Sequence, residues 1–258
     1  MPEVTSYPNG TPCWADLGAP DVAAAAAFYN GLLGWDVEIG PAEMGHYSMA
    51  TVKGQPVAAI ADQQTPGVVA WSTYFGVASV EDPVAKAVAA GATVLLPAMD
   101  VMTFGRMAIL SAPGGAALSL WEPGEHRGAG LIGEHGAIAW NELATRDVAA
   151  SAAFLEATFG LSANKIDMEG VGYYELRRAD GTGVAGMMPM DGDMWPADMP
   201  DHWMVYFGAT DTDATAARAT ELGGQVCVAP TDIPNVGRFA VLEDPQGATF
   251  SIITMSEA

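Results

Sequence analysis

The sequence predicts an α+β chain with two tandem domains, each assembled from two β-α-β-β-β units. Its 258 residues suit two domains of ordinary size, and half of them are hydrophobic, so each domain can bury a core. Residues 203–253 also repeat residues 71–121 without a gap, at a constant offset of 132 (203 minus 71). A match of this length at a fixed period indicates a duplicated structural unit.

The first unit follows a short irregular arm at residues 1–9. Residues 11–17 alternate with a period of two, which is typical of a strand. A helix is expected next, because Asp21 can cap it and an alanine-rich run of high helix propensity follows. Gly31 and Gly34 are expected to end this helix. Three strands and a connection come after it, at residues 35–39, 46–52, 56–61 and 62–70.

The second unit repeats this order of elements. A strand, a helix and three further strands are expected at residues 71–77, 80–90, 94–96, 106–110 and 117–121. The run at 123–135 is rich in glycine and proline and carries no periodicity, so it is interpreted as a linker. This linker divides the chain into a first domain at 10–122 and a second domain at 136–256.

The second domain restates the first with small shifts in register. Trp140 matches Trp14 at an offset of 126, and 172–174 is matched with 45–47 at an offset of 127 (172 minus 45). The offset then rises to 132, so five extra residues (132 minus 127) lie within 188–202. Two interpretations of this inserted loop stay open. It packs on the neighbouring domain, or it forms a lid with Met190, Met194 and Trp195.

The composition limits the expected partners and setting. A net charge of −21 repels phosphate backbones and anionic lipid, so neither nucleic acid nor a membrane is expected as a partner. Cys13 and Cys227 fall in different repeats, which does not predict a disulfide framework. Residues 1–10 lack the basic start and apolar core of a signal peptide, and no apolar run reaches membrane-span length. A reducing, cytoplasmic setting is therefore expected.

Four such units, with the turn Asp244-Pro245-Gln246-Gly247, resemble the vicinal oxygen chelate superfamily. That superfamily includes glyoxalases, bleomycin resistance proteins and extradiol dioxygenases. The matched Trp14 and Trp140, and the Gly-Arg pairs at Arg106 and Arg238, look most like its tandem two-domain actinobacterial branch. The resemblance implies that each domain curls into a U-shaped mixed sheet around a cavity. The two halves are expected to pack as a pseudo-dimer within one chain.

Enzymes of that superfamily hold a divalent metal with His, Gln or Glu on three strands of a domain. Counted from the matching motifs, those positions here are Trp14, Ser72 and Ser119, then Trp140, Met204 and Ser251. Tryptophan has no lone pair to give, and hydroxyls and thioethers are poor ligands for Zn²⁺ or Fe²⁺. Both cavities are therefore predicted to be metal-free, and no cofactor is expected.

The four histidines leave one alternative open. His126 and His135 flank the linker and are expected to be solvated, while His46 is expected in a core or rim position. His202 lies two residues before Met204 and so shares its face of the strand. With Glu142 it offers two corners of an unusual metal site, which is the less favoured interpretation.

Residues two positions from the former metal positions should also face the cavities. The predicted ligand-binding residues are therefore Trp14, Asp16, Ser72, Tyr74, Ser119 and Trp121 in the first domain, and Trp140, Glu142, His202, Met204, Tyr206 and Ser251 in the second. Aromatic walls stack planar ligands, and a carboxylate in an apolar pocket selects a cation or a hydrogen-bond donor. The alternative is that the two tryptophans only fill the space of a lost metal.

These residues favour a small-molecule binding protein of the bleomycin-resistance type, for a planar or aromatic ligand that is cationic or donates hydrogen bonds. The rival is an enzyme. It would be a lyase, isomerase or hydrolase with Glu142 or Asp16 as general base and His202 or Tyr206 as partner. A metal-dependent glyoxalase-like or dioxygenase-like enzyme with unusual ligands is a variant of that rival. A domain kept for protein partners is a third possibility. If one cavity is active, the second is favoured, because it has His202 and the inserted loop.

Overall fold

The computed structural model describes residues 4–168, 171–192 and 195–256, which form two eight-stranded mixed sheets, one in each domain. The first domain contains β1 (Thr11–Ala19), α1 (Val22–Leu33), β2 (Asp36–Val37), a 3-10 turn (Ala42–Met44), β3 (Ser48–Val52), β4 (Gln55–Asp62), β5 (Ala70–Gly76), α2 (Glu81–Ala89), β6 (Thr93–Val101), β7 (Gly105–Ser111) and β8 (Ala117–Pro123). The second contains β9 (Ile138–Thr145), α3 (Val148–Phe159), β10 (Ser162–Met168), β11 (Val171–Arg177), β12 (Gly183–Pro189), β13 (His202–Gly208), α4 (Thr212–Glu221), β14 (Gln225–Ile233), β15 (Gly237–Glu243) and β16 (Thr249–Met255).

Both sheets have the same strand order. It is β2-β3-β4-β1-β5-β8-β7-β6 in the first domain and β10-β11-β12-β9-β13-β16-β15-β14 in the second. The antiparallel pairs β1–β5 and β9–β13 join the two units of each domain at the centre of its sheet. Each sheet therefore consists of two consecutive β-α-β-β-β units, which confirms the predicted fold class.

Helix α1 begins where the sequence predicted and ends later. The Asp21 side chain accepts a hydrogen bond from the Ala24 N–H at 2.9 Å, and Gly34 ends the helix with a left-handed φ of 71°. The expected stop at Gly31 is wrong, because this residue lies inside the helix. Leu222, which follows α4, lies 3.1 Å from where a Cβ of Gly31 would stand, so glycine lets the two helices approach closely.

Two strand boundaries also differ from the prediction. The strand expected at 46–52 starts at Ser48, because Gly45 and His46 follow the 3-10 turn with φ of 63° and 47°, which are not extended. The strand expected at 94–96 is longer and runs over the whole of β6, where it pairs with β7. The apolar run in the sequence underestimates the length of this strand, because many of its residues are exposed.

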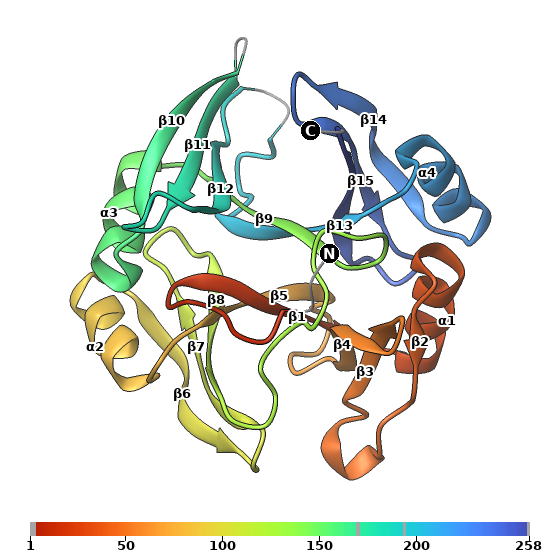
Figure 1. Cartoon of the computed structure of the whole chain (residues 1–258), viewed down its shortest axis with the longest axis horizontal. Coiled ribbons are helices and arrows are strands. Elements are labelled where there is room, and N and C mark those ends of the chain that lie inside the picture. Colours follow the sequence, from red (N-terminus) through yellow and green to blue (C-terminus); the bar gives the residue numbers. More distant parts are fainter. Residues whose placement is uncertain (1–3, 169–170, 193–194, 257–258) are drawn as a thin grey trace.

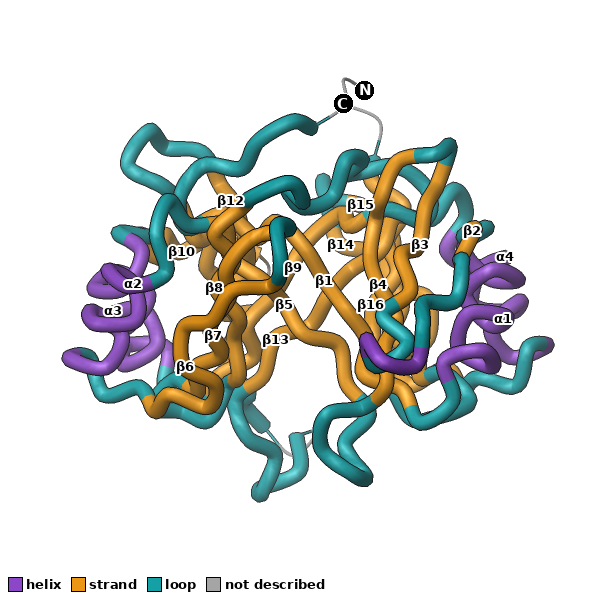
Figure 2. The backbone as a smooth tube through the Cα atoms, turned by 90° about the horizontal axis from the view of Figure 1, so that it is seen from below, coloured by secondary structure: helices purple, strands orange, loops and turns teal. Residues whose placement is uncertain are grey.

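The hydrophobic cores lie between the two sheets. Helices α1 and α4 lie together at one end of the molecule and α2 and α3 at the other, with the strands between them (Figures 1 and 2). Trp71 packs on Phe207 with ring centroids 5.0 Å apart, and Trp203 packs on Phe75 at the same distance. Both tryptophans are 8% exposed and belong to the buried cores. Each core thus contains side chains of both domains, and the two halves pack against each other within one chain.

Two expectations from composition can be compared with the described residues. Cys13 and Cys227 are both free thiols, which agrees with the absence of a predicted disulfide. Within residues 4–168, 171–192 and 195–256, none of the helices has the length and apolar character needed to cross a membrane.

Removal of the Phe207 ring should destabilise both domains together. Phe207 is fully buried and contacts Trp35 and Trp71 of the first domain. Replacement of a core aromatic residue by alanine costs about 3–5 kcal/mol, and a shared core passes this loss to both domains. Phe207→Ala is expected to move a single unfolding transition to lower denaturant concentration, measured by circular dichroism and tryptophan fluorescence.

Phe104→Ala is the matched control, since Phe104 is 39% exposed and its loss should change the midpoint little. Two separate transitions in Phe207→Ala, with one at the midpoint of the unmodified protein, would show that the domains fold independently.

Candidate functional site

A chain of hydrogen bonds on the first sheet connects Trp14, Asp16, Tyr47 and Tyr74, which we call the first site. The Trp14 Nε1–H donates to the Tyr47 hydroxyl at 2.9 Å. Both tyrosine hydroxyls donate to Oδ2 of Asp16, from Tyr74 at 2.7 Å and from Tyr47 at 3.4 Å. Strands β1 and β5 position three of these residues, because Trp14 lies opposite Tyr74 in the antiparallel register. The site therefore holds one carboxylate between two phenol donors beside an indole.

The second site, defined as Trp140, Glu142, Tyr173 and Tyr206, repeats this arrangement. The Trp140 Nε1–H donates to the Tyr173 hydroxyl at 2.9 Å, and the Tyr206 hydroxyl donates to Oε1 of Glu142 at 2.9 Å. Tyr173 also hydrogen-bonds the Glu142 carboxyl. Tyr206 lies opposite Trp140 across the β13–β9 pair, as Tyr74 lies opposite Trp14. The duplication has thus preserved a whole hydrogen-bonded group.

Tyr47 and Tyr173 are the site residues that sequence reasoning missed. The sequence alignment placed Tyr173 opposite His46, and the structure shows that this match is wrong by one residue. Tyr173 corresponds to Tyr47, at an offset of 126 (173 minus 47), because each accepts the indole hydrogen bond of its own tryptophan. The equal separation of 33 residues from Trp14 to Tyr47 and from Trp140 to Tyr173 is the signal that could have found them.

Burial controls the protonation of both carboxyl groups. Removal from water raises the pKa of Asp16 to about 6, against the opposing effect of hydrogen bonds from Tyr74, Ser72 and Tyr47. Burial likewise raises the pKa of Glu142, which is 8% exposed, and hydrogen bonds from Tyr206 and Tyr173 oppose the shift. The pKa of each tyrosine is raised by burial and by the adjacent carboxylate, so the phenols stay protonated and act as donors.

The other predicted ligand-binding residues on the strands, apart from His202, lie around these two groups. Ser72 and Met204 lie opposite Asp16 and Glu142 across the central strand pairs, and both are partly exposed. The remaining three are buried on β8 and β16, the strands that come last in the sequence of each domain. Ser119 lies opposite Tyr74, Ser251 lies opposite Tyr206, and Trp121 lies two residues beyond Ser119. The geometry thus brings most of the predicted ligand-binding residues together around one carboxylate in each domain.

His202 lies farther from Glu142 than the proposed catalytic pairing requires. Its register partner on β9 is Ala144, two residues beyond Glu142. Its protonated Nδ1 donates to the Pro200 carbonyl at 3.0 Å, and its ring lies 6.0 Å from that of Trp195. Of the three predicted catalytic residues, the structure therefore joins Glu142 and Tyr206 directly and places His202 at the edge.

The inserted loop at 188–202 is anchored on the chain. The Asp201 carboxylate accepts hydrogen bonds from the Thr145 hydroxyl at 2.6 Å and from the Arg146 backbone N–H at 2.8 Å. The Asp201 N–H donates to the Gly114 carbonyl of the first domain at 3.3 Å. Met190 of the predicted lid is 3% exposed, Trp195 is partly exposed, and Met194 lies outside the described residues. These contacts favour the interpretation that the loop packs on the neighbouring domain.

The linker covers the first site, and the expectation that His126 is solvated is wrong. The His126 ring lies edge-on to Trp14, with centroids 4.4 Å apart, and 5.6 Å from the ring of Trp121. The Trp121 Nε1–H donates to the His126 carbonyl at 2.9 Å. Burial lowers the pKa of His126 to about 4, so its imidazole is neutral at physiological pH. Trp14 is only 2% exposed beneath it, whereas Trp140 is partly exposed.

The other two histidines lie away from both sites. The His46 Nδ1 lies 2.9 Å from the Asp62 carboxylate in an exposed pair at the rim, as predicted. His135 is exposed, and its Nδ1 accepts a hydrogen bond from the Thr210 N–H at 3.2 Å. Neither contact suggests a role in binding or catalysis.

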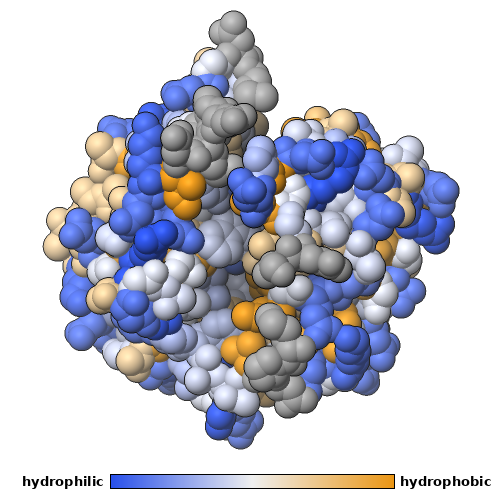
Figure 3. All heavy atoms as spheres, turned by 45° about the horizontal axis from the view of Figure 1, so that its top comes forward, coloured by the Kyte–Doolittle hydropathy of each residue, from blue (hydrophilic) through white to orange (hydrophobic). Residues whose placement is uncertain are grey.

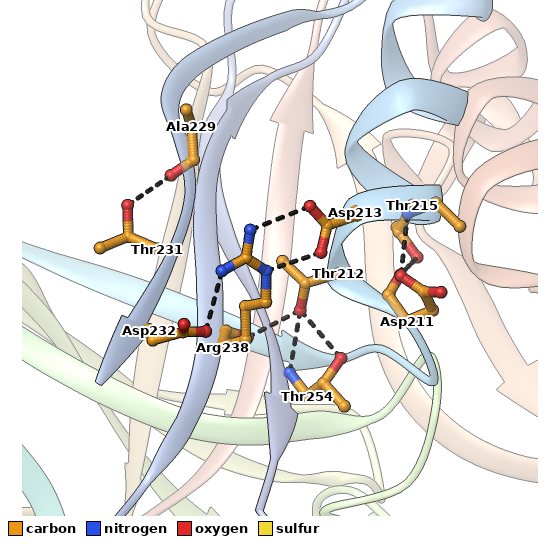
Figure 4. Close-up of polar contacts among 10 residues, drawn as sticks. Asp211, Thr212, Asp213, Thr215, Ala229, Thr231, Asp232, Arg238 and Thr254 are labelled. Carbon is orange, nitrogen blue, oxygen red and sulfur yellow. Dashed lines mark hydrogen bonds and ion pairs between the residues drawn. The ribbon is translucent and has the colours of Figure 1, made fainter. Parts of the chain in front are cut away.

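The repeated Gly-Arg pairs hold carboxylates in place. Arg238 donates to Asp213 at 2.6 and 3.0 Å and to Asp232 at 2.8 Å, so it joins α4 to β14 (Figure 4). Arg106 contacts Glu81 at 2.5 Å and Asp100 at 2.7 Å in the corresponding positions of the first domain. These guanidinium groups are therefore committed to structural ion pairs.

The residues at the sites do not fit a divalent metal. Each site offers one carboxylate, two protonated phenols and an indole, and the described residues contain no group of three His, Cys, Asp or Glu side chains able to hold an ion. Protonated phenols and indoles are not ligands for Zn²⁺ or Mn²⁺.

The face of the second domain is hydrophilic and hollowed. Figure 3 shows a notch between the lobe that carries β10 and β11 and the lobe that carries β14. Trp140, Tyr173, Met204 and Phe239 are all partly exposed on this sheet, and Phe239 lies 6.3 Å from Tyr206. A planar molecule could therefore reach aromatic surface in the second domain.

Comparison with known proteins agrees with this architecture. Residues 137–252 match the family model of the glyoxalase/bleomycin resistance protein/dioxygenase superfamily, and residues 14–120 match that of a glyoxalase-like domain. The protein CFP32 of Mycobacterium bovis, whose name assigns it provisionally to the glyoxylases, is 44% identical over 98% of both chains. The anthracycline biosynthesis protein DauV of Streptomyces sp. strain C5 is 38% identical over 99% of this chain and 97% of its own.

Solved structures show the same fold at lower identity. The Mn(II)-bound glyoxalase from Novosphingobium aromaticivorans superimposes with a TM-score of 0.68 at 14% identity, over 96% of this chain and 83% of that one. The chain therefore belongs to the glyoxalase/bleomycin resistance protein/dioxygenase superfamily, the vicinal oxygen chelate family that its sequence resembles.

Proposed function

We propose that this protein binds a planar, aromatic small molecule that carries a positive charge or donates hydrogen bonds, and that it does so without a metal. The observation that supports the proposal is the group of a tryptophan, two tyrosines and a carboxyl group that occurs in both domains. Aromatic rings supply a flat surface for stacking. A cation placed near both an aromatic face and a carboxylate is stabilised by the cation–π interaction and by attraction to the negative charge.

The names of the relatives are compatible with this ligand class. Two of them, DauV and DnrV, are named for the biosynthesis of anthracyclines, which are compounds with a planar fused-ring system. The high negative charge of the chain also attracts cations in preference to anions. We assign the ligand to the second site first, because Trp140 and Tyr173 are partly exposed there.

An enzyme is the second candidate function. The raised pKa of Glu142 would suit a general base or acid near neutral pH, with the Tyr206 hydroxyl as a hydrogen-bond donor to an oxygen that gains negative charge. The name of CFP32 and the manganese-bound glyoxalase favour this class of function in relatives. The chemistry would be that of a lyase, isomerase or hydrolase, because the site offers acid-base groups and no redox group.

Glu142→Gln distinguishes the two candidates. In a binding protein the loss of one charged hydrogen-bond acceptor should weaken the affinity for proflavine, a planar aromatic cation, about tenfold. In an enzyme the same change should lower the turnover of a substrate by about 10²–10⁴-fold. Affinity is measured by fluorescence titration, and turnover by chromatography of the recovered compound.

Glu156→Gln is the control, since it removes the same charge from an exposed position on α3. An equal loss of affinity in both variants would mean that the overall charge of the chain, and not the second site, attracts the cation.

The affinity for an aromatic cation should also rise with pH. Burial raises the pKa of Glu142 above its ordinary value of 4.5, so the carboxyl group is neutral at pH values below this raised pKa. Cation binding should therefore be weak at low pH and strengthen as the pH rises through the pKa of Glu142. Titrations with proflavine from pH 4 to pH 8 measure this, and Glu142→Gln should show a flatter profile. A profile that is equally steep in the variant would assign the titration to another group.

Purified protein should contain far less than one equivalent of metal. Each site offers one carboxylate and no further metal ligand among its four residues, so added Zn²⁺, Fe²⁺, Mn²⁺ or Ni²⁺ should leave the melting temperature unchanged, whereas an ion bound to the folded state would raise it. Elemental analysis after purification without chelator or metal-affinity resin tests this. One equivalent of tightly held metal would contradict the proposal and favour metal-dependent chemistry with unusual ligands such as Glu142 and His202.

A further inference from the structure

The two sites differ in what lies over their tryptophan rings. Trp14 and Trp140 make the same indole hydrogen bond to a tyrosine at the same distance of 2.9 Å, so the sheets present them alike. Trp14 is nevertheless 2% exposed, while Trp140 is partly exposed. The strands differ near this ring, since Trp121 of β8 aligns with Ile253 of β16, but the ring that contacts Trp14 itself comes from a segment outside the repeated units.

That segment is the linker, and its contact with the first site is made by His126. The imidazole lies edge-on to Trp14 at 4.4 Å and near Trp121 at 5.6 Å, so it fills the corner between the two indoles. Its Nε2 is buried and has no hydrogen-bond partner among the described residues. A flat, neutral, heteroaromatic ring thus rests on the surface that we propose for a planar ligand.

The linker backbone holds this ring firmly. The His126 N–H donates to the Phe104 carbonyl at 3.1 Å, the Ala129 N–H to the Cys13 carbonyl at 2.8 Å, and the Gly130 N–H to the Pro56 carbonyl at 2.7 Å. The Tyr7 hydroxyl also donates to the Ala129 carbonyl at 2.7 Å. These bonds therefore attach the linker to strands β1 and β4, to the turn between β6 and β7, and to the N-terminal arm.

Close packing adds to these bonds. Gly128 has a φ of 103°, and a Cβ at this position would stand 2.6 Å from the Cys13 carbonyl oxygen. The linker thus follows the surface of β1 so closely that it cannot shift there without losing contacts. A ligand would have to displace a well-bonded segment to reach Trp14.

We propose that the His126 ring permanently occupies the first site, so that, of these two sites, only the second binds a planar ligand. This inference rests on the proposed function, since it decides where and how many times that ligand binds. His126 acts as a selectivity residue. Its ring permanently contacts Trp14 in the first domain, whereas Trp140 in the second domain stays partly exposed.

Counting bound proflavine in four proteins tests the proposal. By isothermal titration calorimetry the unmodified protein should bind one equivalent, and His126→Ala should bind two, because the variant exposes Trp14. His126→Phe should bind one, because it keeps a ring against Trp14. His135→Ala, which removes the other linker histidine from an exposed position, should also bind one. Two equivalents in the unmodified protein, or one in His126→Ala, would overturn the inference.

A second measurement separates this inference from the proposed function. Acrylamide quenching reports exposure of tryptophan without any ligand, and His126→Ala should increase the quenchable fraction while His126→Phe should not. The increase should disappear when Trp14→Phe is added to His126→Ala. If proflavine binds to none of the proteins but quenching behaves in this way, the ligand class is wrong and the occupancy of the first site stands. Unchanged quenching in His126→Ala would overturn the occupancy itself.

Discussion

The packing of the two sheets through aromatic side chains determines which residues are available to the sites. Trp71 meets Phe207 and Trp203 meets Phe75, so alternate residues of β5 and β13 point into the shared cores. Because side chains of a strand alternate between its faces, Ser72 and Tyr74 must then lie on the opposite face of the sheet from Trp71, as must Met204 and Tyr206 from Trp203. On β1, Ala15 and Leu17 are fully buried on one face, so Trp14 and Asp16 lie on the opposite face. The aromatic interface between the domains is thus the reason that each carboxylate faces its own site.

The cost of burying those carboxylates is offset by phenol hydrogen bonds and not by positive charge. Asp16 receives hydrogen bonds from Tyr74 and Tyr47, and Glu142 from Tyr206 and Tyr173, while the arginines of the Gly-Arg pairs bind other acids. Phenols donate only one proton each, so every carboxylate keeps lone pairs that the tyrosines do not use. A cation or a donor from a ligand would satisfy them better than the protein does. This is the physical reason for the proposed selection of a ligand by its charge and its hydrogen-bond donors.

Much of the fold could be predicted from the sequence, because the duplication revealed the unit and the alternation of the strands fixed their inward and outward faces. The site could be predicted in part. Trp14, Asp16 and Tyr74 lie on regular strands, where the alternation of side chains predicts which face each residue occupies. Tyr47 follows a 3-10 turn, to which this alternation does not apply. The sequence alignment was shifted by one residue at that turn, so it did not match Tyr47 with Tyr173. His126 could not be found at all, since a glycine-rich linker without periodicity looks solvated until the sheet that it covers is known. Gly31 failed for a similar reason, because its close neighbour Leu222 comes from the other domain.

The two halves diverge at some strand positions, such as Trp121 and Ile253, and also in the segments that the repeat does not include. The strands preserve the tryptophan, the tyrosines and the acid, but the linker lies over Trp14, and the insertion at 188–202 occurs only in the second domain. That insertion is fastened by Asp201 to Thr145 and Arg146 at the corner before α3, and by its backbone to Gly114 of the first domain. These contacts strengthen the domain interface. Under the proposed function, the same sheet has a covered tryptophan in one copy and an open binding site in the other, although both copies keep a tryptophan, two tyrosines and an acid.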